Sequence, residues 1–293
     1  VKEIFGDAAM AEELARLHTK LSSANSINWG RLVPQIVYYF SSYADLLAEG
    51  RISLGDAVNY TVPTGNFGDI LAGFYAKRMG LPVGRLVCAS NANNVLTDFL
   101  QSGIYDRRRA FYQTISPSMD ILVSSNLERL LYHLTEDTAQ VAVWMRELTE
   151  TGAYDASVLL PQLREHFWAA FADDDATRAE IRAVYERTKY TLDPHTAVAY
   201  RAAENYRRAT GDERPMVVLS TASPYKFGVS VLAALGAEPE DDPFKQMEHL
   251  HQLSGMTIPP GLAGLREKPV RHADACARDG MRAVVLAFAK ETH

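Results

Sequence analysis

The stretch between residues 57 and 101 constrains the fold of this chain more than any other. A short apolar run rich in strand-forming residues (57–63) leads into a glycine-containing turn (64–69), and a helical pattern follows at once. A second strand pattern (85–89) and a second helical pattern (93–101) come next. Strand, helix and strand in this order predict a βαβ unit, whose strands are parallel and whose crossover is right-handed.

The rest of the chain reads mostly as helices. These are predicted at residues 10–20, 29–43, 126–133, 138–149, 177–188 and 195–209, with strands at 216–220 and, near the end, at 283–287. Trp144, Phe167 and Trp168 are interpreted as residues that pack helices together. The sequence therefore predicts an α/β fold, a three-layer αβα sandwich with a mostly parallel sheet and no visible internal domain boundary.

Composition argues against several classes of function. The net charge is -6, and the only basic block, residues 107–109, is too short to indicate binding to nucleic acid or to an anionic membrane. No apolar run reaches the length of a membrane span. Cys88 and Cys276 lie far apart and outside any C-x-x-C pair, so no metal or redox motif is predicted. We expect a reduced, cytoplasmic protein, although a disulfide between these two cysteines is left open.

The turn after the first strand is the segment that points most directly to a ligand. It reads Thr64-Gly65-Asn66-Phe67-Gly68-Asp69, and a helix begins where it ends. Unpaired N–H groups at a helix N-terminus bind anions, and glycines allow the backbone to approach a ligand closely. The turn lacks the spacing of a P-loop or of a dinucleotide fingerprint. On this pattern alone, a phosphate seat and a plain strand-to-helix turn with Asp69 as a cap are equally supported.

Six blocks in a fixed order carry a resemblance to a known family. They are NSINWGR at 25–31, VPTGNFGDILAG at 62–73, SPSMDI at 116–121, SSNLER at 124–129, LDPHTAV at 192–198 and TASPYKF at 221–227. Together they resemble the threonine synthases, which are fold-type-II pyridoxal-phosphate enzymes, and above all the longer ones of bacteria and fungi. The resemblance implies that residues 1–293 form a C-terminal catalytic-domain fragment, containing most of the large domain and part of the small one.

The chain departs from the family pattern in two places. The family's Schiff-base lysine lies in an upstream Phe-Lys-Asp-type motif, and none of the lysines here sits in such a motif. The chain is therefore expected to be truncated or processed, to contain no catalytic residue of its own and to be inactive by itself. In addition, Ser223-Pro224-Tyr225 stands where the family commonly has His-Pro-Ala, although Thr221 is retained.

The resemblance also implies the reaction and the residues that serve it. The family converts O-phospho-L-homoserine and water to L-threonine and phosphate, a lyase reaction of threonine biosynthesis that uses pyridoxal 5'-phosphate. The cofactor phosphate is expected at Thr64, Gly65, Asn66, Phe67, Gly68 and Asp69, and the pyridine nitrogen at Thr221. The substrate phosphate is expected at Asn25, Ser26 and Arg31, because Arg can bind it through two parallel hydrogen bonds. Capping by Asn25 and Ser26, with a surface Arg31, is the alternative.

Other polar residues receive plainer interpretations. His195 is read as a first-turn residue of a helix capped by Asp193, and Lys226 as a surface residue. Asp120 and Asn126 are read as turn and capping residues. Two further functions stay open: another fold-type-II enzyme such as a threonine or serine dehydratase, and a non-catalytic binding module. Monomer and homodimer are also both open.

Overall fold

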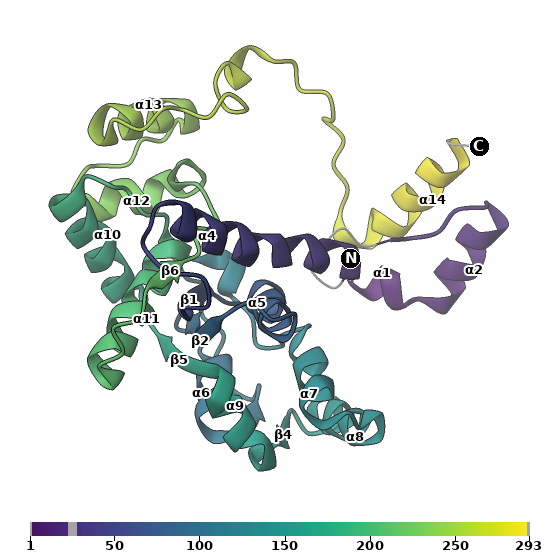
Figure 1. Ribbon diagram of the computed structural model, residues 1–293. Helices are drawn as coiled ribbons and strands as arrows, with labels where there is room; N and C mark the ends of the chain where they lie inside the picture. The colour runs from purple at the N-terminus through teal and green to yellow at the C-terminus, as the bar shows by residue number, and fades with distance from the viewer. Residues whose placement is uncertain (1, 23–27, 292–293) are drawn as a thin grey trace. The chain divides into compact units, whose positions relative to one another are not determined.

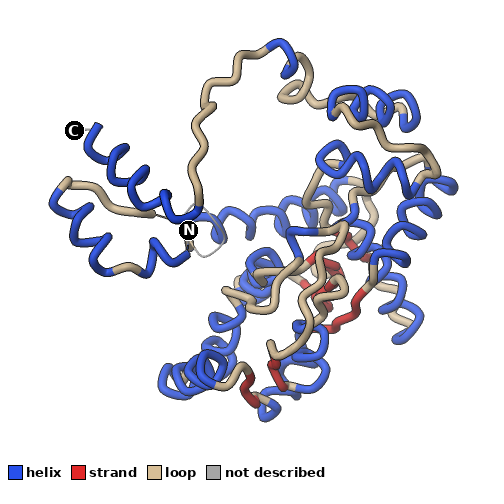
Figure 2. The backbone as a smooth tube through the Cα atoms, turned by 180° about the vertical axis from the view of Figure 1, so that it is seen from behind, coloured by secondary structure: helices blue, strands red, loops and turns tan. Residues whose placement is uncertain are grey.

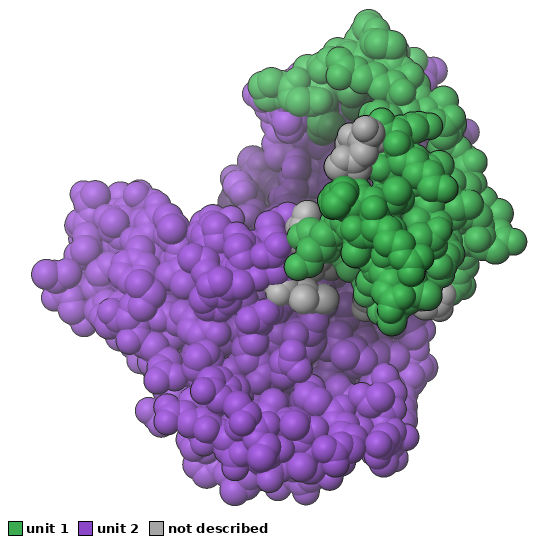
Figure 3. Space-filling view, turned by 90° about the vertical axis from the view of Figure 1, so that its right-hand side faces the viewer, with its two compact units in different colours: residues 1–25, 260–293 green, residues 26–259 purple. Residues whose placement is uncertain are grey.

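The computed structural model describes residues 2–22 and 28–291, and contacts divide the chain into two compact units. Unit 1 combines residues 1–25 with 260–293, and unit 2 comprises residues 26–259 (Figure 3). No shift in composition marks either junction, so this division was not visible in the sequence. The interpretation of residues 1–293 as a C-terminal catalytic-domain fragment stays a prediction.

The centre of unit 2 is a parallel sheet of four strands. These are β1 (Val58–Pro63), β2 (Val83–Ser90), β5 (Phe167–Phe171) and β6 (Met216–Val218), in the order β5-β2-β1-β6. Thr61 of β1 lies opposite Val87 of β2 on one side and Val218 of β6 on the other. A separate pair, β3 (Ile104–Asp106) and β4 (Ala153–Asp155), is antiparallel. The predicted α/β class with a mostly parallel sheet is confirmed.

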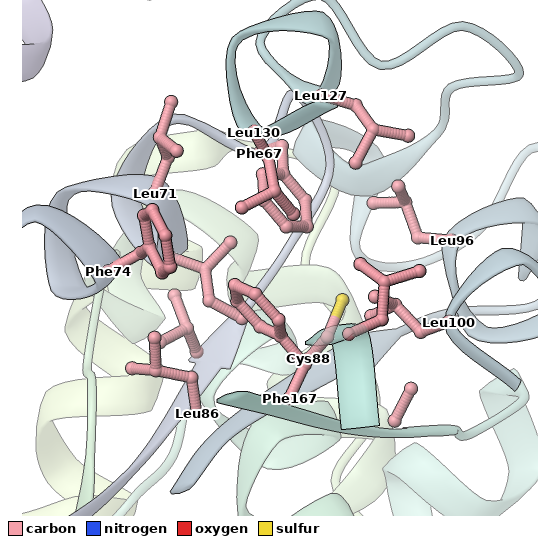
Figure 4. Packing of buried hydrophobic residues seen from close by; sticks show 14 of the residues in the cluster. Phe67, Leu71, Phe74, Leu86, Cys88, Leu96, Leu100, Leu127, Leu130 and Phe167 are labelled. Carbon is pink, nitrogen blue, oxygen red and sulfur yellow. The ribbon is translucent and has the colours of Figure 1, made fainter. Parts of the chain in front are cut away.

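Helices cover both faces of this sheet and create two hydrophobic layers. In β2, Leu86 and Cys88 face one layer, which contains α5 (Gly68–Arg78) and α6 (Val95–Ser102). Val87 and Ala89 face the other layer, which is formed against α11 (Pro194–Thr210). This alternation buries most residues of the two central strands, β1 and β2, on both faces, which explains why these strands are mainly apolar. Figure 4 shows the first layer, where the rings of Phe67, Phe74 and Phe167 meet.

The remaining helices complete the unit around these layers. They are α3 (Trp29–Leu32), α4 (Ile36–Ala48), α7 (Leu127–Thr135), α8 (Thr138–Glu150), α9 (Leu160–His166), α10 (Asp174–Thr188), α12 (Gly228–Ala234) and α13 (Pro243–Ser254). Figure 1 labels most of them, and Figure 2 shows the strands enclosed by helices. The single helix predicted at 29–43 is interrupted by a 3-10 turn, Val33–Gln35, because Pro34 removes one backbone donor.

Two predictions of secondary structure were wrong. Phe167 and Trp168 belong to β5, not to a helix, and their side chains enter opposite layers of the sandwich. The run at 167–171 is apolar throughout and shows no alternation with polar residues, so no strand was predicted there and the two rings were interpreted as helix-packing residues. The run at 283–287 is part of α14 (Met281–Glu291), not a terminal strand.

Unit 1 is a small helical cluster. It contains α1 (Lys2–Gly6), α2 (Ala8–Arg16) and α14, and Met10, Leu14 and Ala289 form its buried centre. Arg282 of α14 is paired with two carboxylates of the first segment, Asp7 at 2.5 Å and Glu13 at 3.2 Å. The contact thus joins the two ends of the sequence. Across the described ranges, no helix combines the length and apolarity needed to cross a membrane.

The two cysteines should react very differently with thiol reagents. Both are free; Cys276 is exposed, whereas burial raises the pKa of the Cys88 thiol to about 12. Because the thiolate is the reactive form, we expect an alkylating reagent to modify Cys276 alone until the protein unfolds. Mass spectrometry before and after addition of denaturant measures this. In the Cys276→Ser variant the native protein should stay unmodified, and rapid modification of Cys88 would contradict the packing described.

Candidate functional site

The predicted cofactor residues lie at the carboxyl end of the parallel sheet, between β1 and β6. From β1 the chain crosses over α5 to β2 and then to β5, whereas β6 lies on the opposite side of β1 and follows α11. The strand order therefore reverses between β1 and β6, and such a reversal is where α/β sheets open a crevice for ligands. The 64–69 turn follows β1, and Thr221 follows β6.

The carbonyl groups of the turn are held by side chains from another segment. The Ser124 hydroxyl donates to the Gly65 carbonyl at 2.9 Å. The Asn66 carbonyl accepts two hydrogen bonds from Asn126, one from its backbone N–H at 3.1 Å and one from its side-chain amide at 3.0 Å. The sequence analysis interpreted Asn126 only as a capping residue. Its contacts show that it fixes the turn, and it is fully buried there.

In the described part of the chain, the turn's N–H groups beyond Thr64, whose own N–H bonds to the Ala89 carbonyl at 2.8 Å, have no acceptor. Helix α5 begins immediately after Phe67, whose φ of 61° lies in the left-handed region, and no side chain caps it. The first helical bond runs from the Leu71 N–H to the Phe67 carbonyl at 3.2 Å. Among the described residues, no group accepts a hydrogen bond from the backbone N–H groups of residues 65–70. These donors, at the positive end of the helix, suit an anion.

Gly65 is required by packing on one side of the turn. A Cβ atom built on it would lie 2.7 Å from the Ser118 carbonyl oxygen and 3.2 Å from the Met119 Cα. Both are backbone atoms, which cannot rotate away. The glycine therefore allows the segment at 118–119 to form a wall directly against the turn, a contact that no local sequence pattern predicts.

A cavity of about 440 Å³ brings Asp69 of the turn together with Thr221. Its lining consists of Gln35, Tyr38, Ser42, Asp69, Val217, Leu219, Ser220 and Thr221. The Gln35 side-chain oxygen is buried and, among the described residues, has no hydrogen-bond partner. The sequence analysis missed Gln35, Ser42 and Ser220. Gln35 and Ser42 are seven residues apart, so they lie on one helical face. Only the apolar residues of this helix were interpreted from the sequence, as a packing pattern.

Asp69 is a partly buried carboxyl group at the edge of this cavity. Burial raises its pKa to about 6, and a hydrogen bond from the Tyr39 hydroxyl opposes that shift. The Tyr39 hydroxyl lies 2.7 Å from the Asp69 backbone carbonyl and 3.3 Å from its side-chain oxygen. Asp69 therefore changes its charge in the range just below neutral pH, beside the unpaired N–H groups.

Of the three residues predicted to bind the substrate phosphate, only Arg31 lies in the described ranges. Asn25 and Ser26 lie outside the described residues. Arg31 is exposed on α3, which packs against α5, and the N-cap of α3 is Asn28, whose side chain accepts from the Gly30 N–H at 2.9 Å. The model thus places Arg31 on a helix next to the one that begins at the turn, and does not bring it into the lining of the 440 Å³ cavity.

The plainer interpretations of other polar residues hold at two positions. Asp193 caps α11, as predicted. Lys226 is exposed, as predicted, and its ammonium lies 5.6 Å from the centre of the Phe227 ring. Asp120 does more than end a turn, because it accepts hydrogen bonds from the side chains of Asn91 and Asn93 at 2.8 and 3.0 Å. Within the described ranges, no group of three His, Cys, Asp or Glu residues is arranged to hold a metal ion.

Comparison with known proteins shows which proteins this chain is similar to. Residues 196–285 match the family model described as threonine synthase, C-terminal. The chain is 44% identical over 239 residues to human threonine synthase-like 1, covering 80% of this chain and 32% of that protein. It is 43% identical over 255 residues to threonine synthase of Eremothecium gossypii, covering 81% of this chain and 48% of that enzyme.

Two solved structures resemble the model over 99% of the chain. One is pyridoxal-phosphate-bound threonine synthase from Brucella melitensis, with a TM-score of 0.79 and 37% identity. The other is threonine synthase from yeast, with a TM-score of 0.78 and 31% identity. The chain covers 56% of each of those proteins. It thus spans between 32% and 56% of the length of these relatives.

The residues present fit a bound pyridoxal phosphate. The unpaired N–H groups at 65–70 suit its phosphate, and the cavity beside Asp69 reaches Thr221, whose hydroxyl suits a ring nitrogen. The Gln35 oxygen offers a further acceptor that the chain itself does not use. These features are independent of the family match, since they come from hydrogen bonds and cavity lining alone.

Replacing Gly65 by alanine should damage the turn. The new Cβ would approach the Ser118 carbonyl oxygen to 2.7 Å, so the two segments must separate. We expect the Gly65→Ala variant to lose about 1–3 kcal/mol of unfolding free energy, the usual cost of overpacking. The affinity for inorganic phosphate, measured by titration calorimetry, should decrease as well. Gly261→Ala is the control, because nothing lies within 4 Å of its Cβ position, and it should behave like the wild type.

Asp69 should make stability depend on pH. Burial raises its folded-state pKa to about 6, above the ordinary value of 3.8, so folding favours the protonated form. As pH rises from about 4 to 7, the wild type should lose about 1–3 kcal/mol of unfolding free energy relative to Asp69→Asn. Denaturant titrations at a series of pH values measure this difference. Parallel pH profiles for the two proteins would show that Asp69 ionises normally.

Proposed function

We propose, because this chain is a homologue of the threonine synthases and matches their C-terminal portion, that its parent protein is a pyridoxal-phosphate-dependent threonine synthase. The reaction would be the conversion of O-phospho-L-homoserine and water to L-threonine and phosphate. The observation that carries this proposal is that Thr221 lines one cavity with Asp69, which belongs to the 65–70 segment whose N–H groups find no acceptor within the described ranges. A lyase role in cytoplasmic threonine biosynthesis belongs to the same proposal.

The cofactor would be held at two ends. The N–H groups of residues 65–69 would bind its phosphate, with Thr64 beside them, and the Thr221 hydroxyl would meet the pyridine nitrogen. A hydroxyl is a neutral partner, so it leaves that nitrogen less protonated than a carboxylate would. When bound, pyridoxal phosphate supplies an electron sink for charge that develops on the substrate carbons. The chain's own part is to fix the orientation of the cofactor.

The substrate phosphate needs its own cationic site, since the net charge of the chain is -6. Arg31 would pair with two phosphate oxygens at once, and Asn25 and Ser26 would add directed donors. The same contacts would hold the phosphate as it leaves and its negative charge increases. We propose that this pairing, rather than the cofactor site, selects O-phospho-L-homoserine over unphosphorylated amino acids.

This sequence contains no lysine in the family's motif, so we propose that the 293-residue chain is inactive alone. The test therefore uses the full-length parent protein. We expect it to release phosphate from O-phospho-L-homoserine and to form threonine in equal amounts. Arg31→Gln should raise KM about tenfold or more with a smaller effect on kcat, because it removes a charge-assisted contact. The KM of Arg31→Lys should lie between those of the wild type and Arg31→Gln.

The control for this experiment is Arg16→Gln, at an exposed arginine of unit 1. It should not change either constant. A parent protein that ignored the phosphorylated substrate but deaminated threonine or serine would be a dehydratase. One that bound no pyridoxal phosphate, judged by the visible absorbance of the bound cofactor, would be a binding module on the same scaffold.

A further inference from the structure

Three buried polar residues at the start of α11 form a cluster that capping alone does not require. The side chains of Asp193, His195 and Thr196 are each at most 3% exposed. Asp193 accepts hydrogen bonds from the backbone N–H groups of His195 at 2.9 Å and Thr196 at 3.3 Å, and this completes the cap. The Thr196 hydroxyl also donates to the second Asp193 oxygen. The cap needs the Asp193 carboxylate, but it does not need the other two side chains.

His195 uses both ring nitrogens. Its Nδ1 lies 3.1 Å from the Asp193 carboxylate, which can only accept, so Nδ1 carries the proton. Nε2 is then an acceptor, and it receives the Ser118 backbone N–H at 3.1 Å. The ring also packs at 4.7 Å from that of Phe227. One tautomer therefore satisfies the whole ring and connects α11 to the segment that contains Ser118.

That segment is the wall of the turn described above. The Ser118 carbonyl oxygen lies 2.7 Å from the position of a Cβ on Gly65, so its backbone rests directly against the turn. Met119, the next residue, is buried in the hydrophobic layer formed against α11, where Val198 also lies. His195 thus holds the wall by a hydrogen bond, and the apolar contacts hold it from the side.

Thr196 extends the same cluster in the other direction. Its hydroxyl oxygen lies 3.2 Å from that of Ser220, and because the one Thr196 proton goes to Asp193, the Ser220 hydroxyl donates this hydrogen bond. Ser220 lines the 440 Å³ cavity next to Thr221, just beyond the end of β6. Ser118, which packs against the turn, and Ser220, which precedes Thr221, are therefore each hydrogen-bonded to a residue at the start of α11.

We infer that Asp193, His195 and Thr196 are positioning residues, which fix the spacing between the phosphate-binding turn and the Thr221 end of the site. This inference rests on the proposed function, because it assigns the two ends to the phosphate and the ring of one cofactor. His195 acts on the turn through Ser118, and Thr196 acts on Thr221 through Ser220. Asp193 orients both side chains from a helix start.

The test measures backbone order in the ligand-free 293-residue chain by ¹⁵N relaxation NMR. His195→Leu should raise mobility at residues 116–119 and 65–67 and leave residues 220–222 unchanged. Thr196→Val should raise mobility at residues 220–222 and leave residues 116–119 and 65–67 unchanged. His195→Gln and Thr196→Ser should restore order, since Gln can place an oxygen near Nε2 and Ser retains the hydroxyl. The matched control is Thr210→Val at the other end of α11, where the hydroxyl donates to the Tyr206 carbonyl at 2.8 Å.

A second measurement separates this inference from the proposed function. Titration with inorganic phosphate should shift the N–H signals of residues 65–70 in the wild type. His195→Leu should weaken that binding about tenfold, the scale of one buried hydrogen bond, and Thr196→Val should not. If phosphate leaves these signals unchanged, the cofactor-site assignment fails, and the relaxation data still decide the positioning roles.

The inference is overturned if His195→Leu leaves residues 116–119 and 65–67 as ordered as in the wild type. It is also overturned if each variant loosens the whole chain equally, because the cluster would then be only structural. Should His195→Leu not fold, the pair His195→Gln and His195→Asn decides. Asn reaches only about as far as Nδ1, so it should loosen the turn, whereas Gln should not; equal behaviour of the two contradicts the role.

Discussion

The candidate site depends on one unpaired set of N–H groups at the start of α5. The carbonyl groups of the turn are taken by Ser124 and Asn126, whereas the N–H groups of residues 65–70 find no acceptor among the described residues. Solvation or a bound anion must satisfy those donors, since leaving backbone groups without a partner costs free energy. The fold therefore holds these donors in place for a ligand through the protein's own contacts.

The sheet brings the other half of the site to the same place. Because β1 and β6 are parallel neighbours, their carboxyl ends open at one edge, and the chain leaves them toward opposite layers. The Leu219 N–H, just beyond β6, still bonds to the Thr61 carbonyl at 3.0 Å, which keeps Thr221 level with the turn. Thr64 and Thr221, which are 157 positions apart in sequence, are thus aligned by strand register rather than by loop length.

The sequence predicted the local parts of this arrangement and missed the contacts between them. The βαβ unit, the turn at 64–69 and the cap at Asp193 follow from periodicity and capping rules, which act over a few residues. The strand at 167–171 was missed because burial on both faces removes the alternation that identifies strands. Gln35, Ser42 and Ser220 reach the cavity only through tertiary packing. Nothing in a local pattern shows that Ser118 will lie against Gly65 or that His195 will hold it there.

Helix capping decides which of the helices can offer donors to a ligand. Helices α8, α10, α11 and α13 each begin at an aspartate whose side chain accepts from first-turn N–H groups. Helix α5 begins instead at Phe67, whose ring is buried and contributes no acceptor, and its first-turn carboxyl is Asp69. Burial keeps the pKa of Asp69 near 6, so this carboxyl competes weakly with an external anion when it is protonated. The same residue type thus closes the N-terminus of α11 and leaves that of α5 available, and the difference lies in where each carboxyl sits relative to the helix start.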